Sequence, residues 1–316
     1  MEPTIRDGVP CFAWARPRLR RWVFSGLAFA LVWPAGMAVD GFGRDREERP
    51  QPAAVVTMVT DGKELARAGA LSTAPVGRVG VAAGDAGVGA GDVARIERLL
   101  RRIEPVLGTF ATGAWSATVV LYETQDGYRS AASRSFAPTM VETAVQQTGG
   151  FTTGTTVFLP LYKYTEDAFL ANTLAHELTH AVVNQMGIRG GLPSWLDEGF
   201  AWSNGFAAQT LIDPDSVEPV RAALQNQLEA ARAQGRWRPI RDDPTAPLAS
   251  SLSYNLEYED YLAFEPLLAQ GGQAAFARFL RLAAGEEMAR AFRQVYGQSP
   301  EAYLQGWNAA FNPAGA

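Results

Sequence analysis

Two histidines four residues apart in one apolar segment constrain this chain more than any other feature. They are His176 and His180, in the sequence His-Glu-Leu-Thr-His, and the chain contains no other histidine. The apolar character of residues 166–186 predicts one long helix, closed at its C-terminal end by Gly187. Residues four apart on a helix lie on one face, so both imidazoles can reach a single ion. With Glu177 beside them, the pattern predicts a zinc site in which Glu177 acts on the attacking water.

A zinc site of this kind needs a third protein ligand from elsewhere in the chain. Residues 187–192 are rich in glycine and predict a reversal, and a helix over about 194–204 follows Pro193. Ser194 and Asp197, three residues apart, suggest a capping box at its start. An antiparallel return of this length brings Glu198 opposite the two histidines. We therefore predict that Glu198 is the third metal ligand.

The rest of the chain from residue 92 onward predicts an α+β fold, with a small N-terminal sheet followed by a mostly helical C-terminal part. A helix is expected over 92–104, capped by Asp92 and stopped by Pro105. A buried strand is expected over 117–122, a short helix over 126–133, and an edge strand over 155–159 that Pro160 ends. The expected C-terminal helices cover about 216–234, 254–270, 273–283, 286–296 and 299–311.

The first 39 residues predict export from the cytoplasm. Basic residues at 16–21 precede an apolar run at 22–33 and the small residues around Ala38. This order is typical of a secretory signal peptide. If the apolar run continues over 22–39, it is just long enough for a single N-terminal membrane anchor. Both interpretations place the remaining chain outside the cytoplasm, in the periplasm, at the cell surface or secreted, whereas a buried core helix fits the flanks less well.

Residues 40–91 differ in composition from the segments on either side of them. A charged, proline-bearing stretch is followed by a Gly- and Ala-rich stretch at 77–91. Such sequences bury too little apolar surface to offset the entropy of ordering. We expect a low-complexity linker or prosegment here, with one apolar run at 53–59 that could form a strand. The folded domain is accordingly expected to span 92–316.

Composition excludes several other classes of protein. The formal net charge is −5, and this argues against a nucleic-acid partner. The single cysteine, Cys11, lies upstream of the apolar run, so the exported part has neither a disulfide nor a thiol nucleophile.

Two motifs together resemble a known family. The sequence His-Glu-Leu-Thr-His at 176–180, followed by Leu-Pro-Ser-Trp-Leu-Asp-Glu-Gly-Phe-Ala at 192–201, is similar to the gluzincin zinc metallopeptidases, most closely to peptidase MA-like domains. The resemblance covers about residues 95–310. It implies a zincin-like fold, in which a sheet packs against the active-site helix and an extended peptide substrate pairs with the edge strand, here 155–159. It also implies Zn²⁺ as the cofactor and Glu198 as a ligand.

The resemblance also implies a hydrogen-bond donor for the oxyanion, supplied from the helical half. The tyrosine-rich segment 253–262 matches the helix that carries it, so Tyr254 is the predicted donor and Tyr258 the second choice. A packing stripe is an equally good explanation of these tyrosines. Trp202 stands where many relatives have an acid that orients a ligand, so Asp197, Asn172 or a backbone carbonyl must serve instead.

The sequence therefore predicts zinc-dependent hydrolysis of peptide bonds outside the cytoplasm, as an endopeptidase. An aminopeptidase is less favoured because the Gly-x-Met-Glu-Asn signature is missing. Two alternatives from other classes remain. One is a catalytically idle zinc-binding module at the cell surface, and the other is an interaction protein whose working part is residues 40–91.

Overall fold

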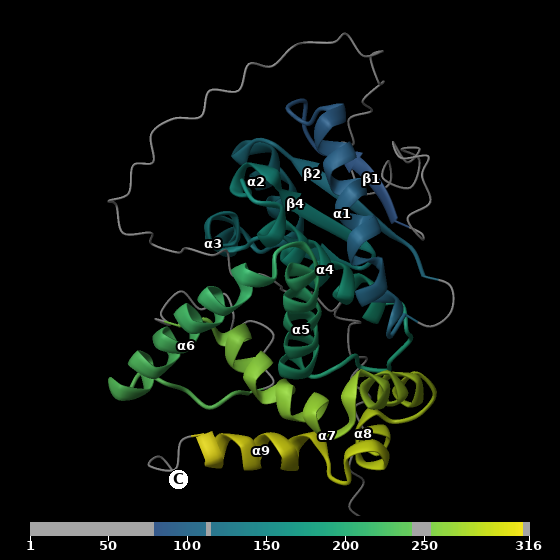
Figure 1. The fold of residues 1–316 in the computed structure, drawn as a ribbon, viewed down its shortest axis with the longest axis vertical. Coiled ribbons are helices and arrows are strands. Elements are labelled where there is room, and N and C mark those ends of the chain that lie inside the picture. The colour runs from purple at the N-terminus through teal and green to yellow at the C-terminus, as the bar shows by residue number, and fades with distance from the viewer. Residues whose placement is uncertain (1–78, 112–114, 242–253, 312–316) are drawn as a thin grey trace, which may run out of the picture.

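The computed structural model describes residues 79–111, 115–241 and 254–311 (Figure 1). The predicted signal or anchor and the apolar run at 53–59 lie outside these ranges. No helix within them combines the length and the apolar character of a membrane span.

A four-stranded mixed sheet forms the N-terminal half. Its order is β1 (Val79–Ala83), β2 (Ala117–Tyr122), β4 (Thr156–Pro160) and β3 (Phe151–Thr153). The first three strands are parallel, and β3 is antiparallel to β4. This small mixed sheet is compatible with the predicted α+β fold class, and the buried strand at 117–122 is confirmed.

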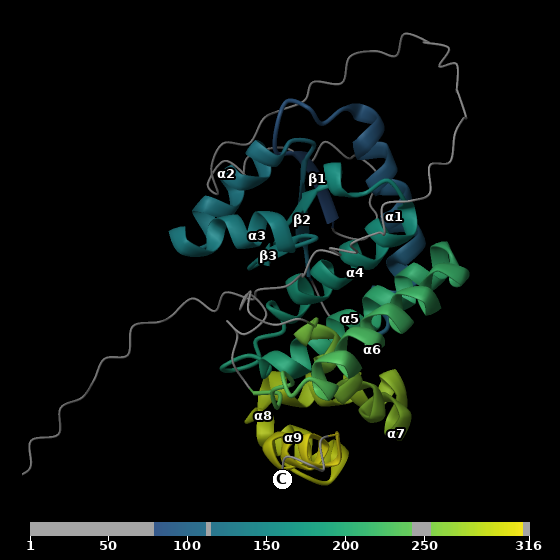
Figure 2. The ribbon, with the colours of Figure 1, turned by 90° about the vertical axis from the view of Figure 1, so that its left-hand side faces the viewer.

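Helices cover both faces of this sheet (Figure 2). One face carries Val119 and Leu121 and packs against α1 (Ala90–Gly108) and α4 (Asp167–Val183). The other face carries Val120 and Tyr122 and packs against α2 (Gln125–Ser135) and α3 (Val141–Gln147). Side chains alternate between faces along each strand, and this divides the apolar residues of β2 between two cores.

The expectation of a linker throughout 40–91 is wrong for its last part, because Val79–Ala83 forms β1. Val79 pairs with Ala117, and the strand packs into the same core as α1 and α4. The Asp85 carboxylate holds the turn that follows, accepting hydrogen bonds from the Thr124 backbone N–H at 2.9 Å and its hydroxyl at 2.7 Å. The Gly- and Ala-rich composition hid this strand, because its partners lie more than thirty residues away.

The predicted ends of α1 also need correction. The helix starts at Ala90 with Gly89 at the N-cap, and Asp92 lies three residues inside, where its carboxylate accepts from the Gly89 N–H at 2.8 Å. Pro105 does not stop the helix, which continues to Gly108. Val106 and Leu107 are buried in the core, so packing outweighs the hydrogen bond that proline cannot donate.

The predicted edge strand is an interior strand, and a different segment forms the edge. β4 is paired on both sides, with β2 and with β3. The chain forms β3 ahead of β4 and reverses at Gly154, which has a φ of +60°. A three-residue strand is too short to show an alternating pattern, so it could not be recognised from the sequence.

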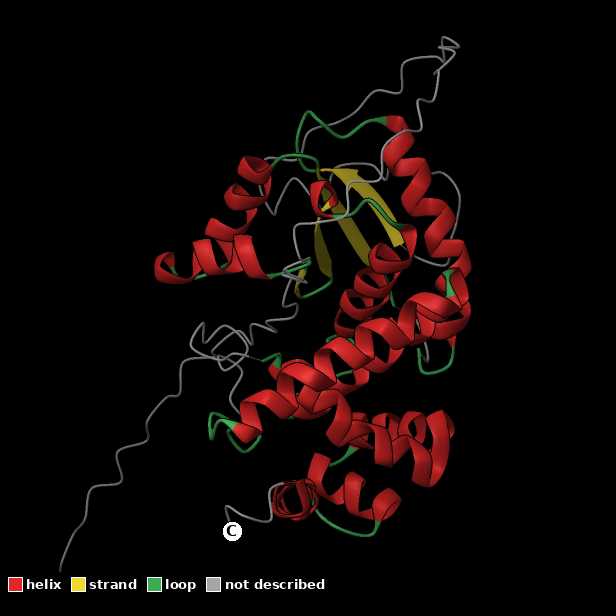
Figure 3. Ribbon diagram, turned by 60° about the vertical axis from the view of Figure 1, so that its left-hand side comes forward, coloured by secondary structure: helices red, strands yellow, loops and turns green. Residues whose placement is uncertain are grey.

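Within the described residues, the C-terminal half contains helices joined by turns and loops, and no strand (Figure 3). Its helices are α5 (Ser194–Ile212), α6 (Val217–Ala233), α7 (Leu256–Gly285), α8 (Met288–Tyr296) and α9 (Pro300–Phe311), and short 3-10 turns occur at Pro138–Met140, Leu161–Lys163 and Pro214–Ser216. Gly272, with a φ of +68°, kinks α7 between the two helices that the sequence predicts. α5 continues well past its predicted end at residue 204, and α4 ends at Val183, before its predicted end at 186.

Gly199 lies where α5 packs directly against the backbone of α7. A Cβ atom at this position would lie 2.6 Å from the Asp260 carbonyl oxygen and 2.5 Å from the Phe264 Cβ. No carbon atom fits at those distances, so glycine is required for α7 to pack this close to α5.

Gly199→Ala is therefore expected to lower the free energy of unfolding by about 1–3 kcal/mol, the usual cost of overpacking a core. Urea unfolding measures the change. Gly91→Ala is the matched control, because Gly91 is an exposed helical glycine and a Cβ there meets nothing within 4 Å. That control should match or exceed the wild-type stability. Equal stability of the Gly199 variant would show that the two helices are free to separate.

Glu259 is fully buried in α7 beside the cluster formed by Leu228, Ala231 and Tyr254. Trp237 donates its indole N–H to the Glu259 carboxyl at 2.5 Å. Burial raises the pKa of Glu259 from 4.5 to about 8, although hydrogen bonds from Trp237 and Tyr254 oppose the shift. The carboxyl is therefore protonated at neutral pH in the folded protein.

A carboxyl whose pKa is raised by folding stabilises the protein fully below its unfolded pKa, and this contribution is lost as the pH rises. We expect the stability of the protein to fall between about pH 4.5 and about pH 8 because of Glu259. Glu259→Gln keeps an acceptor for Trp237 without an ionisable group, and should flatten the pH profile in that window. Denaturant unfolding across the pH range compares the two proteins, and parallel profiles would contradict the assignment.

Candidate metal centre

The helix α4 lies at the centre of the molecule, between the sheet and the helical half (Figure 1). Every residue from Leu170 to Val183 is buried, because the sheet, α1 and α5 all pack around this one helix. His176 and His180 lie one turn apart on α4, and Glu198 is in the second turn of the neighbouring α5.

The structure brings these three predicted ligands together. The His176 and His180 Nε2 atoms are 3.2 Å apart, and the Glu198 Oε2 atom is 3.4 Å from the first and 3.5 Å from the second. Two ligand atoms, each about 2.0–2.1 Å from a tetrahedral ion, are about 3.3–3.4 Å apart. The three atoms therefore have the spacing of three corners of one coordination tetrahedron.

The chemistry of these groups also fits a cation. The exposed fractions are 4% for His176, 0% for His180 and 3% for Glu198. The Glu198 Oε2 atom is buried without a hydrogen-bond partner, and an orphaned buried carboxylate oxygen is costly. A cation among the three atoms would satisfy that oxygen and both Nε2 atoms together. His176, His180 and Glu198 thus form a buried cluster that can hold a metal ion.

Burial governs the protonation of the two histidines differently. Burial, assisted by the neighbouring His180, lowers the pKa of His176 to about 4, which keeps its imidazole neutral and able to ligate. Burial also lowers the pKa of His180, but the carboxylates of Asp197 and Glu198 outweigh this and raise it well above its usual value. Carboxylates therefore act on both imidazoles, and their negative charge also favours a metal cation in the cluster.

Asp197, Asn172 and a backbone carbonyl are the three predicted partners for a histidine ligand, and of these Asp197 lies against His180. Its Oδ2 atom lies 3.3 Å from the His180 Nδ1 atom, on the side of the ring opposite the cluster. The predicted capping box is wrong, because Pro193 occupies the N-cap and Asp197 faces His180. Asn172 is engaged elsewhere, since its side-chain amide donates to Gln209 at 2.8 Å.

A second acid near the cluster comes from α7 and was missed from the sequence. The Trp202 ring meets the His176 ring edge-on at 5.9 Å, and its indole N–H donates to the Glu257 carboxylate at 3.1 Å. Glu257 is buried, and its charge acts on the His176 pKa. The sequence did contain a signal for a buried acid in this helix. Acids stand at 257, 259 and 260 in a segment with helical apolar periodicity, and three charges at this spacing cannot all face solvent.

Glu177 is completely buried next to the cluster, between α4 and β3. The Thr152 hydroxyl lies 2.7 Å from the Glu177 Oε2 atom and 3.0 Å from the Glu177 carbonyl oxygen. Thr152 was not recognised from the sequence, because β3 itself was not.

The predicted oxyanion donor has other partners. The Tyr254 hydroxyl accepts from the Arg238 N–H at 3.1 Å, and its ring packs against α6. Tyr258 packs against the Trp202 ring at 6.4 Å, close to the residues around His176. None of the described contacts of Tyr254 joins it to the metal cluster, so its catalytic role stays a prediction.

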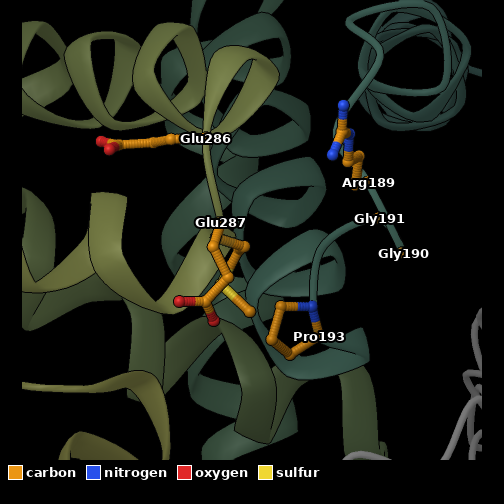
Figure 4. A pocket seen from close by; sticks show the side chains of 7 residues that line it. Arg189, Gly190, Gly191, Pro193, Glu286 and Glu287 are labelled. Atoms are coloured by element: carbon orange, nitrogen blue, oxygen red, sulfur yellow. The ribbon is translucent and has the colours of Figure 1, made fainter.

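The loop between the two ligand-bearing helices borders a separate cavity of about 370 Å³ (Figure 4). Arg189 and Pro193 lie on one side, and Glu287 at the start of α8 lies on the other. None of the three cluster residues lines it. The cavity therefore belongs to the packing of the loop on the α7–α8 turn.

Comparison with known proteins adds a distant structural likeness. No protein-family model and no curated protein matches the chain. Among solved structures, the chain is similar to a mutant of an M1 zinc metallopeptidase from Deinococcus radiodurans bound to a Tyr-Ser-Ala substrate, with a TM-score of 0.38 and 16% identity. The match covers 72% of this chain and 47% of that one, so this chain spans about half the length of the protein it matches.

Proposed function

We propose that this protein is a zinc-dependent peptidase in which His176, His180 and Glu198 bind the metal and Glu177 is the general base. The observation that carries the proposal is the triangle of ligand atoms, with sides of 3.2, 3.4 and 3.5 Å, buried beside the Glu177 carboxylate. A structural zinc site uses four protein ligands, whereas three ligands leave a position for the reaction.

Zinc is the metal that best suits this set of ligands. Imidazole nitrogens with one carboxylate are typical of catalytic zinc sites, whereas magnesium and calcium prefer oxygen ligands only. When bound here, zinc would polarise the substrate carbonyl and make the attacking water more acidic.

The protein's own residues would then supply positioning and proton transfer. Glu177 accepts a proton from the water as its oxygen attacks the peptide carbonyl, and returns it to the leaving nitrogen as the C–N bond breaks. The Asp197 carboxylate, 3.3 Å from Nδ1, would orient the His180 ring so that Nε2 faces the cluster. The Trp202 indole packs edge-on against the His176 ring and would limit the rotation of that ring.

The family resemblance, corrected by the structure, supports a peptide substrate paired with the edge of the sheet. The edge beside Glu177 is β3, not the strand predicted at 155–159. A peptide extended along β3 would place its carbonyl groups next to Glu177 and the cluster.

We propose an endopeptidase that acts outside the cytoplasm, either secreted or anchored by residues 22–39. The support for export is the basic segment followed by an apolar run in its first 39 residues.

Cleavage of a peptide library by the purified, zinc-loaded chain tests this function. Internal cleavage that stops with a zinc chelator and returns with added zinc is the expected result, read by mass spectrometry of the products. Stepwise loss of N-terminal residues would instead identify an aminopeptidase. If zinc binds at one equivalent and no chelator-sensitive product forms, the protein is a catalytically idle zinc-binding module.

A further inference from the structure

The edge strand β3 contacts the proposed general base directly. Thr152 is 2% exposed and Glu177 is 0% exposed, and their hydroxyl and Oε2 atoms are 2.7 Å apart. At that distance the hydroxyl donates a short, charge-assisted hydrogen bond to the carboxylate. The same hydroxyl lies 3.0 Å from the Glu177 carbonyl oxygen, so it touches both the side chain and the backbone of one residue.

Two residues of the β3 segment enclose the Glu177 side chain together. Gly150 and Thr152 are two residues apart and face α4, whereas Phe151 packs into the core on the other face of the sheet. A Cβ atom at Gly150 would lie 3.2 Å from the Glu177 Cγ. The glycine gives the methylene chain room, and the threonine fixes the carboxylate at its end.

The segment that leads into β3 is itself held in place. Lys163 donates to the carbonyl oxygens of Val145 and Thr148, both at 2.7 Å. The Tyr164 hydroxyl donates to the Gly149 carbonyl at 2.8 Å. Thr152 therefore follows closely after a backbone segment that two side chains hold in place, and it can impose its geometry on Glu177.

We propose that Thr152 is a positioning residue, whose hydroxyl holds the Glu177 carboxylate in the orientation that proton transfer needs. This inference rests on the proposed peptidase function. A glutamate has three side-chain torsions, and loss of the hydrogen bond would let the carboxylate turn away from the attacking water. Misplacement of a reacting group by about 1 Å can cost about 100-fold in rate.

Three substitutions test the role in the full-length, zinc-loaded protein. Thr152→Val keeps the shape of the side chain without its hydroxyl, and is expected to lower kcat by about 10- to 100-fold, with KM and zinc affinity unchanged. Thr152→Ser restores the hydroxyl, and should return kcat to near the wild-type value. Thr109→Val is the matched control, because it removes a hydroxyl that donates to the Val106 carbonyl at the exposed end of α1, away from β3, and kcat should not change.

A crystal structure of each variant without zinc gives a readout that does not depend on activity. The Glu177 carboxylate should occupy a new position, or several, in the Thr152→Val protein, and its original position in the Thr152→Ser protein. An unmoved carboxylate in the valine variant, or no rescue of kcat by serine, overturns the inference. If the wild-type protein cleaves no peptide, the peptidase proposal fails, and with it the role of Thr152 in proton transfer. The crystal structures still decide whether Thr152 orients Glu177.

Discussion

Replacement of Glu177 by glutamine is expected to remove peptide hydrolysis and leave metal binding intact. Glutamine has nearly the same shape and can still contact Thr152, but it cannot accept the proton of the attacking water. The loss of general-base catalysis predicts a fall in kcat of about 10²- to 10⁴-fold. Steady-state kinetics on a peptide substrate, with zinc content measured on the same sample, checks both parts of the prediction.

Glu166→Gln is the matched control for this substitution. Glu166 occupies the exposed N-cap of the same helix and makes no capping hydrogen bond with its side chain. Both substitutions remove one negative charge from the same helix, but Glu166 does not lie beside the metal cluster. Turnover by Glu177→Gln equal to that of the control would eliminate Glu177 as the general base.

The second large effect is expected from His180→Ala, which should lose the metal. Removal of an outer-shell partner of a zinc ligand typically costs about 10- to 100-fold in metal affinity, and loss of a ligand should cost more. Zinc titration against a competing chelator measures the affinity, and circular dichroism verifies that the variant is folded.

The alanine variant also leaves Asp197 and Glu198 buried without their partner, and that can destabilise the fold by about 3–5 kcal/mol. His180→Gln retains a polar side chain of similar volume at the same place and serves as the second variant. A folded protein of either kind that binds zinc with wild-type affinity would place the metal elsewhere.

The site could be predicted from the sequence as far as local spacing determines it. His176 and His180 are brought together by one helical turn, and Glu198 by a short glycine-rich reversal between two adjacent helices. Only local geometry is needed for these three residues. The periodic helical segments from α6 onward were predictable for the same reason.

What could not be predicted depends on partners far away in the sequence. β1 was mistaken for linker because only its pairing with β2 makes it a strand, and β3 is too short for any pattern. Thr152 and Glu257 reach the site from a strand and a helix whose placement is decided by packing. Asp197 fitted a capping box by local rules, but a contact with His180 outweighs the cap.

Zinc K-edge absorption and an anomalous-difference crystal structure of the zinc-loaded protein test the central claim most directly. We predict one zinc ion, bound to the Nε2 atoms of His176 and His180 and to a carboxylate oxygen of Glu198, at about 2.0–2.2 Å from each. A zinc ion bound without Glu198, or found at another place in the chain, would contradict the account.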